Sequence, residues 1–577
     1  MFDRYFQDEL ANLRDLGAEF SESHPAIAPM LSGATTDPDV ERLLEGVAFL
    51  TALLRQKLDD EFPEVIHELI RLIWPHYLRP VPCSTVVAFT PKPTLKQSAV
   101  VPAGIHMGSV PVEGTPCTFR TCYDVELHPI QLVEATFVEA SGKPPAIRLV
   151  LELRGLKLSD WSPRALRFFL SGSYAEATDL YLLLQRYLRQ VVITPLDDGS
   201  SVTLTPENIR PVAFSGDEGL IPYPTRSFPG YRILQEYFIL PERFLFLDLL
   251  GWDHWIDRGE GDRFEISFEL NELPFGTPRV KRDHFVLSAT PAINVFSQEA
   301  EPIRLDHKSA EYPVRPAGGS ADHYQVYSLQ NVVGFVQGTA EQREYVPFEV
   351  FSPQGQGTPV YHVTVRRSPT KSVSDVYLSV AYPPEMKLSG SETLSIRLEC
   401  TNGALPEGLQ VGDISVPTSD SPEFAEFRNI RPLSATVLPP LGKNLLWRLL
   451  SHMSLNYTSL AKAENLKAVL ELYVFDETRD RAGVIANKKR ISGIEEVTAR
   501  SSNKLVSGVM MRGQEIVVKI REDHFAGPGD LFLFGSVLDS FLGSYASMNT
   551  YTQLVVEEVS RGDRYKWPAR IGEHFLI

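Results

Sequence analysis

The chain has 577 residues, of which 43% are apolar and 22% charged, a composition typical of a soluble globular protein. This length predicts roughly four domains. The formal net charge of −17 argues against nucleic acid as a ligand, because it repels a phosphate backbone. No run of about 18 apolar residues is present, and the polar N-terminus lacks signal-peptide features. With only four cysteines, we expect a reducing, cytoplasmic location and no direct membrane insertion.

Residues 1–83 predict a helical N-terminal region. Its second helix begins at Asp37-Pro38, an N-cap residue followed by proline at the first helical position. One face of this helix is apolar over five turns, through Val40, Leu43, Leu44, Val47, Leu50, Leu54 and Leu58. Such stripes can bury one another or together face a partner.

This N-terminal region is also acidic. Residues 1–80 carry 15 Asp or Glu and 7 Lys or Arg, a net charge of −8. An acidic helical face is usually solvated. The alternative is a docking surface for a basic partner, and its candidate residues are Glu41, Glu45 and Asp59.

Two β-rich regions follow, over residues 84–290 and 291–435. Apolar and polar residues alternate over 147–153 and 263–270 in the first region, which also contains a helical insertion near Glu176 to Arg189. In the second, 394–400 alternates in the same way. The Gly-, Pro- and Ser-rich segment 405–422 is the best linker candidate.

Residues 436–577 predict an α+β C-terminal domain. Helices return after Pro439-Pro440, strands are expected over Val506 to Arg521 with a turn at Arg512-Gly513, and an aromatic helix follows over 531–545. Aromatic residues and arginine are enriched at interfaces, so Trp447, Arg448 and Phe541 are candidates for contacts with another chain, against the alternative of plain core.

An aromatic stretch from Gly219 to Asp253 interleaves rings with prolines, which suits a fixed, well-packed junction. Ser227-Phe228-Pro229-Gly230 predicts a tight turn, and a short helix from Tyr231 and a buried strand from Phe244 follow.

Four blocks in this sequence resemble the type VI secretion baseplate protein TssF, also called VasA or ImpG. They are the stretch with Phe228, Pro229, Gly230 and Tyr231, the segment 291–307 ending in Asp306-His307, the segment 439–452, and the segment 531–539. They occur in the family's order and span nearly the whole chain.

The resemblance implies a structural component of the baseplate wedge and not an enzyme. In that family two TssF copies join one TssG in a common helical bundle, and the fold resembles the wedge protein of contractile phage tails. The wedge contacts TssK and TssE, gathers around the spike, docks on the membrane complex and starts assembly of the tube and sheath. A wedge of another contractile injection system is the alternative.

The residues show no catalytic, cofactor or metal constellation. His67-Glu68 begins a zinc-protease motif, but Arg71 stands where the second histidine is needed. Asp306-His307 could be half of a triad, although no Gly-x-Ser-x-Gly elbow accompanies it, and a structural hydrogen bond is the plainer interpretation. A hydrolase on a β-rich scaffold is therefore the weaker hypothesis.

Overall fold

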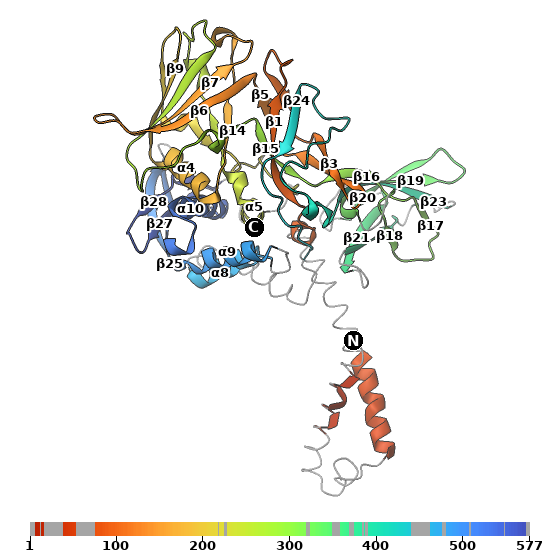
Figure 1. Ribbon diagram of the computed structural model, residues 1–577. Coiled ribbons are helices and arrows are strands. Elements are labelled where there is room, and N and C mark those ends of the chain that lie inside the picture. The colour runs from red at the N-terminus through yellow and green to blue at the C-terminus, as the bar shows by residue number, and fades with distance from the viewer. Residues whose placement is uncertain are drawn as a thin grey trace. The chain divides into compact units, whose positions relative to one another are not determined.

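The computed structural model describes residues 6, 7, 9–11, 13, 14, 16, 38–53, 75–216, 218–223, 228–318, 323–348, 358–367, 374–383, 386, 391–439, 462–475, 480–506, 509–546 and 548–572. The chain divides into two compact units (Figure 1). Unit 1 comprises Met1–Leu78 and Pro440–Leu450, and unit 2 comprises Arg79–Pro439 and Ser451–Ile577. The four-domain division of the sequence stays a prediction.

The described part of unit 1 is helical. Residues 38–53 form a helix, as the Asp37-Pro38 start predicts, and η1 (Pro75–Leu78) is a short 3₁₀ turn. Ala48 and Ala52 are fully buried, whereas Leu43 and Leu50 are 69% and 61% exposed. The small residues therefore face the interior, and much of the predicted apolar stripe faces outward.

Unit 2 begins with an antiparallel sheet that joins distant parts of the sequence, in the order β24-β1-β15-β4-β3. A core of fifteen buried residues, including Phe89, Phe119 and Phe427, lies against it. A two-stranded sheet, β2-β5, accompanies it. The strands are β1 (Ser84–Pro91), β2 (Ala99–Val101), β3 (His106–Val112), β4 (Thr115–Thr121), β5 (Val125–Leu127), β15 (Ala289–Ile293) and β24 (Ala425–Asn429).

The segment predicted as a linker is part of this fold, so that prediction is wrong. Residues 405–422 lie along β3: Gly108 and Val416 exchange backbone hydrogen bonds, and Ile414 is fully buried. The Asn429 side chain accepts the N–H groups of Gly412 and Ile414. Polar composition suggested a free loop, but hydrogen bonds to a distant asparagine hold the segment in place.

Two further antiparallel sheets carry the helical insertion. The first has the order β10-β9-β13-β7-β6, and the second β11-β12-β8-β14. The predicted alternating strands are β7 and β13, and the predicted insertion is α4 (Tyr174–Arg186), which starts with a capping box at Ser173 and Glu176. The strands are β6 (Ile130–Val138), β7 (Ala146–Leu153), β8 (Leu166–Leu170), β9 (Leu188–Pro195), β10 (Val202–Leu204), β11 (Ile209–Pro211), β12 (Phe246–Leu249), β13 (Arg263–Leu270) and β14 (Phe285–Leu287).

The third β-rich part of unit 2 closes on itself. Its path runs β16-β23-β19-β20-β21-β22-β18, with β17 also on β23, and an Ala300–Pro316 bridge joins the two ends. Closure removes exposed sheet edges and encloses a core of residues such as Leu305, Leu378 and Leu394. The strands are β16 (Phe296–Glu299), β17 (Ile303–Leu305), β18 (Tyr312–Val314), β19 (Gln325–Val336), β20 (Gln342–Pro347), β21 (Val360–Arg367), β22 (Ser374–Ala381) and β23 (Glu392–Thr401).

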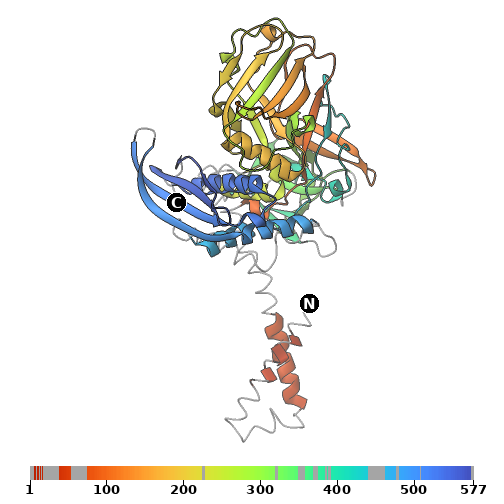
Figure 2. The ribbon, with the colours of Figure 1, turned by 60° about the vertical axis from the view of Figure 1, so that its left-hand side comes forward.

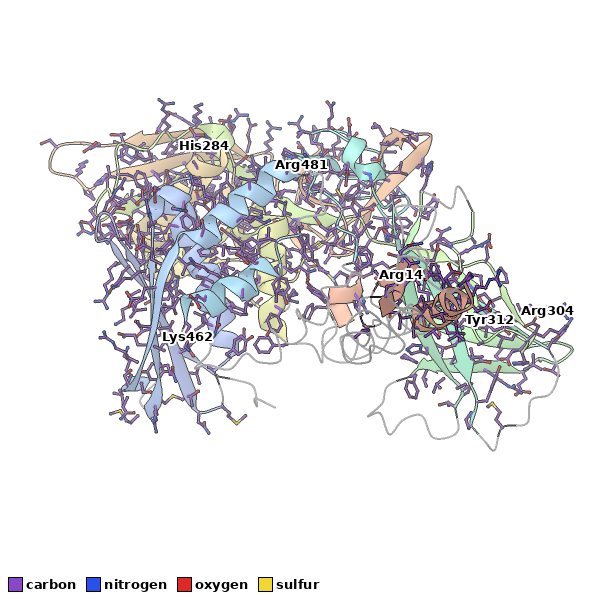
Figure 3. All side chains as sticks on the ribbon, turned by 90° about the horizontal axis from the view of Figure 1, so that it is seen from below. Arg14, His284, Arg304, Tyr312, Lys462 and Arg481 are labelled. Atoms are coloured by element: carbon purple, nitrogen blue, oxygen red, sulfur yellow. The ribbon has the colours of Figure 1, made fainter. Side chains whose placement is uncertain are left out.

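The C-terminal part of unit 2 is α+β, with β25 and β26 forming a long hairpin that extends as a curved arm (Figure 2). The predicted turn at Arg512-Gly513 is wrong: Gly513 lies inside β26, and a Cβ there would lie 2.4 Å from the Tyr551 ring. The elements are α8 (Ala463–Glu471), α9 (Arg481–Ser492), β25 (Ile494–Val506), β26 (Val509–Ile520), α10 (Pro528–Ser544), β27 (Thr550–Glu558), β28 (Arg564–Lys566) and β29 (Arg570–Ile571). Lys462 and Arg481 mark the starts of α8 and α9 (Figure 3).

Candidate partner-binding surfaces

Within the aromatic stretch, residues 228–230 begin a helix and do not form the predicted turn. Phe228 is the N-cap and Pro229 the first residue of α5 (Pro229–Ile239), where a proline loses no hydrogen bond. At Gly230 a Cβ would lie 2.7 Å from the Phe228 ring and 3.2 Å from the Ser544 side chain. The glycine therefore permits the close approach of α5 to the end of α10.

Side chains from distant segments pack around Tyr231 at this approach. The Tyr231 ring stacks on Tyr473, with centroids 5.8 Å apart, and its hydroxyl lies 2.5 Å from that of Tyr545. Phe541 is fully buried with its ring 6.0 Å from that of Tyr231. The structure thus gives Phe541 a core position within its own chain, which is one of the two interpretations of the sequence.

A buried carboxylate ties four helices together beside these rings. Asp530, in the first turn of α10, is fully buried and accepts a hydrogen bond from the Arg490 Nε of α9 at 3.0 Å. Its other oxygen accepts from the Tyr174 hydroxyl of α4 at 3.0 Å and lies 3.5 Å from that of Tyr237 in α5. Burial acts to lower the pKa of Arg490, but Tyr237, Tyr174 and the Asp530 carboxylate together raise it. The sequence shows no signal of this cluster, because its members lie up to 356 residues apart.

A second buried pair fixes the loop before α5. Glu236 and Arg243 are both fully buried and form an ion pair. Glu236 accepts the N–H groups of Leu220 and Ile221, at 2.8 and 2.9 Å, while Arg243 donates to two backbone carbonyls. Burial lowers the pKa of Arg243. Because the two charges pair with each other and both side chains also bind backbone groups, the arrangement is a structural tie.

The Asp306-His307 pair also serves the fold. Asp306 accepts from the Lys308 N–H and the Tyr312 hydroxyl, and both bonds lower the pKa of its carboxyl. His307 has a left-handed φ of 55°, and its backbone N–H donates to the same tyrosine hydroxyl. The carboxylate is thus engaged by a turn and a strand residue, and no described contact joins it to the imidazole as a triad requires.

The acidic candidates lie on the helix of residues 38–53. Glu41 is partly buried and pairs with Arg14 inside unit 1, while Glu45 is exposed. Next to them lies an apolar stripe at helical spacing, comprising Leu43, Val47 and Leu50, with Val47 38% exposed. Asp59, Trp447 and Arg448 lie outside the described residues.

The described residues offer little else for chemistry. They contain no group of three or more His, Cys, Asp or Glu side chains placed to hold a metal ion. Cys117 is buried in β4, and burial raises its pKa to about 11. No helix among them is both long and apolar enough to span a bilayer.

Comparison with known proteins decides the family. The sequence model described as "Type VI secretion system, TssF" matches residues 1–574. The chain belongs to the TssF family. It is 31% identical over 626 aligned residues to the type VI secretion system component TssF1 of Pseudomonas aeruginosa, and the match covers 98% of each chain. TssF is a family of structural baseplate proteins, so the chain is not an enzyme.

Solved structures of baseplate assemblies contain chains with the same fold. One, from a TssK–TssF–TssG baseplate subcomplex studied by cryo-electron microscopy, has a TM-score of 0.77 and 29% identity, and the match covers 92% of this chain and 98% of that one. Another, from a type VI baseplate complex, has a TM-score of 0.61 and 25% identity over the full length of both chains. The expected mixed α+β, multidomain and β-rich fold is therefore that of a TssF chain.

The structure also exposes two apolar surfaces that were not predicted from the sequence. Ile256, in the loop before β13, is 92% exposed, and Leu505 and Met510 of the β25–β26 hairpin are 69% and 68% exposed. The signal in the sequence for the first surface is a single aliphatic residue, Ile256, among the charged residues of 252–263. The sequence gives no signal for the second surface, on the hairpin, because alternation alone does not show which face of a strand lacks a neighbour.

Proposed function

We propose that the chain is a structural subunit of a type VI secretion baseplate wedge and assembles there with TssG and TssK. The support is its likeness, over 92% of its length, to a chain of a TssK–TssF–TssG subcomplex. Two copies of this chain join one TssG, and TssE, the spike, the tube and the sheath are further neighbours. The wedge docks on the membrane complex at the cytoplasmic face of the inner membrane and initiates tube and sheath assembly.

The exposed apolar stripe of unit 1 carries this proposal. Leu43, Val47 and Leu50 recur at spacings of four and three residues, so they lie on one side of the helix. Fully burying a leucine is worth roughly 1.5–3 kcal/mol, which a second helix could supply by packing on the stripe. A helical bundle shared with TssG gives the stripe such a partner.

Acidic residues beside the stripe would set the orientation of that bundle. Glu45 is exposed and Glu41 is held by Arg14. Exposed charges at the rim of an apolar contact act mainly on the rate and specificity of association. Reversal of Glu41, Glu45 and Asp59 should therefore weaken partner binding and leave the monomer folded.

Native mass spectrometry of the chain co-expressed with TssG tests the proposal. We expect a stable two-to-one complex, and its loss in a Leu43→Asp/Leu50→Asp variant. The matched control is Ile485→Asp, since Ile485 is equally exposed, at 67%, but lies on α9 in unit 2. A monomer that never copurifies with TssG would refute the wedge assignment, and equal loss in the control would refute the role of the stripe.

A further inference from the structure

The end of the β25–β26 hairpin is cationic and apolar. We call residues 500–512 the distal arm. It contains Arg500, Lys504 and Arg512 and no carboxylate, a formal charge of +3 in a chain of −17. Leu505 and Met510 lie opposite each other across the two strands, and both are more than two-thirds exposed. Because β27 pairs with β26 only from Arg512 onward, this part of the hairpin has two strands (Figure 2).

The two faces of the arm differ. On one face Lys504 donates to Glu515 at 2.9 Å and lies over the Tyr551 ring, so its charge is engaged within the chain. The opposite face carries Leu505, Met510 and the exposed Arg512. Arg512 lies opposite Asn503 in the strand pairing. Two adjoining apolar side chains with a guanidinium beside them favour a partner that is both apolar and acidic.

Pairing of two arms edge to edge does not fit the sequence of β25. An antiparallel pair centred on Ser502 would place Arg500 of one copy opposite Lys504 of the other. Like charges directly opposite each other destabilise a strand pair. The exposed apolar face of the arm is therefore a better docking element than its edge.

A complementary surface lies elsewhere on unit 2. The loops of residues 196–200 and 252–263 lie side by side, with the Ser200 hydroxyl 2.7 Å from the Asp257 carboxylate. Together they contain six carboxylates and two arginines, a formal charge of −4. Ile256 lies among them at 92% exposure, and Leu196 is 44% exposed. We call this surface the Ile256 loop.

The Ile256 loop is held rigidly although its isoleucine is exposed. The Arg258 guanidinium donates to the carbonyls of Trp161, Trp252 and Trp255, and both neighbouring tryptophans of the loop are buried. Asp198 accepts the N–H groups of Glu260 and Gly261. An apolar side chain presented on a fixed backbone loses little conformational entropy on binding, which is a property of interface anchors.

We propose that the distal arm of one copy docks on the Ile256 loop of a second copy of this chain. Leu505 and Met510 cover Ile256 and Leu196, and Arg512, on the same face of the arm, lies against the carboxylates around them. The occupant is a second copy because the face with Leu505, Met510 and Arg512 is apolar and cationic, the Ile256 loop is apolar and acidic, and both surfaces occur on this chain. The inference rests on the proposed function, in which two copies meet in one wedge.

Site-specific crosslinking in the intact complex tests this contact. Two differently tagged full-length chains, one with Met510→Cys and the other with Ile256→Cys, are co-expressed with TssG and treated with a short bismaleimide. The native thiols interfere little, since Cys83, Cys117 and Cys400 are buried and burial raises the pKa of Cys122 to about 12. We expect a crosslink between the two tags, and none above background when Ile485→Cys replaces Ile256→Cys.

Charge exchange gives an independent readout of the same contact. Arg512→Glu in the first chain should lower the crosslink yield at least about tenfold, because like charges then face each other. Asp253→Lys with Asp262→Lys in the second chain should restore it; both aspartates are exposed and lie in the loop. Restoration is not expected if the Arg512 substitution only disturbs the fold.

The outcomes separate this inference from the proposed function. A two-to-one complex that forms normally but crosslinks no better than the Ile485 control overturns the arm contact and leaves the wedge assignment standing. Absence of any complex containing two copies refutes both. The contact would also be overturned if no crosslink forms and the chain floats with anionic phospholipid vesicles, but the Arg512→Glu variant does not. That result would assign the arm to a membrane surface.

Discussion

Arg490→Met should detach α9 locally from the body of unit 2. Arg490 donates to the fully buried Asp530 at 3.0 Å and lies over the Tyr174 ring, 5.4 Å from its centroid. Among the residues of α9, only Ile491 is buried. The helix therefore depends on this ion pair more than on apolar contacts, apart from an Asn487 bond to the Phe238 carbonyl at 3.3 Å.

The size of the destabilisation depends on the hydrogen bonds that Asp530 keeps in the Arg490→Met variant. Removing one partner of a buried ion pair costs about 3–5 kcal/mol, because the other charge stays buried. Asp530 keeps hydrogen bonds from the Tyr174 hydroxyl and the Ala526 N–H, both at 3.0 Å. We therefore expect the lower end, about 3 kcal/mol, which corresponds to a roughly 100-fold change in an opening equilibrium.

Hydrogen exchange with mass spectrometry measures this opening directly, since local unfolding is seen peptide by peptide. Peptides covering 481–492 should exchange about 100-fold faster in the variant. Lys489→Met is the matched control, because Lys489 is the preceding residue of the same helix and is exposed. Unchanged exchange over 481–492 in Arg490→Met, or equal acceleration in the control, would refute the reasoning.

Two further substitutions test the core around α10. Burial raises the pKa of Asp539 to about 6 from 3.8 although Arg570 donates to it, so the folded state binds this proton more tightly and stability from Asp539 should rise as pH falls from 7 to 4. Thermal denaturation across this range should show the wild type gaining about 2 kcal/mol of stability relative to Asp539→Asn. Equal pH dependence of the two proteins would contradict the raised pKa. A Cβ at Gly529 would lie 2.2 Å from the Thr178 backbone, so Gly529→Ala should cost roughly 1–3 kcal/mol by separating α4 from α10. Gly276→Ala, where no atom lies within 4 Å, should leave the melting temperature nearly unchanged, and equal effects would refute the close-approach argument.

Local pattern predicted the regular elements well. The alternation over 147–153, 263–270 and 394–400 corresponds to β7, β13 and β23, and the aromatic spacing over 531–545 corresponds to α10. These predictions hold because side-chain period is a property of the backbone conformation itself. The predicted turn over Ser227 to Gly230 is wrong in its described part, 228–230, because Pro229 begins α5 and Gly230 permits a close contact with Phe228 and Ser544. The predicted turn at Arg512-Gly513 is wrong because Gly513 lies inside β26 against Tyr551.

The sequence by itself determined the family, the element types and the absence of a recognisable catalytic motif, since these depend on residue order and local spacing. Only the tertiary structure decided which of these residues meet. It placed Phe541 in the core and paired Asp530 with Arg490 across 40 residues. It also left Leu43, Ile256 and Met510 exposed. The physical reason is that burial and pairing depend on which distant segments pack together, and a stripe of apolar residues is the same in sequence whether its own chain or a partner covers it.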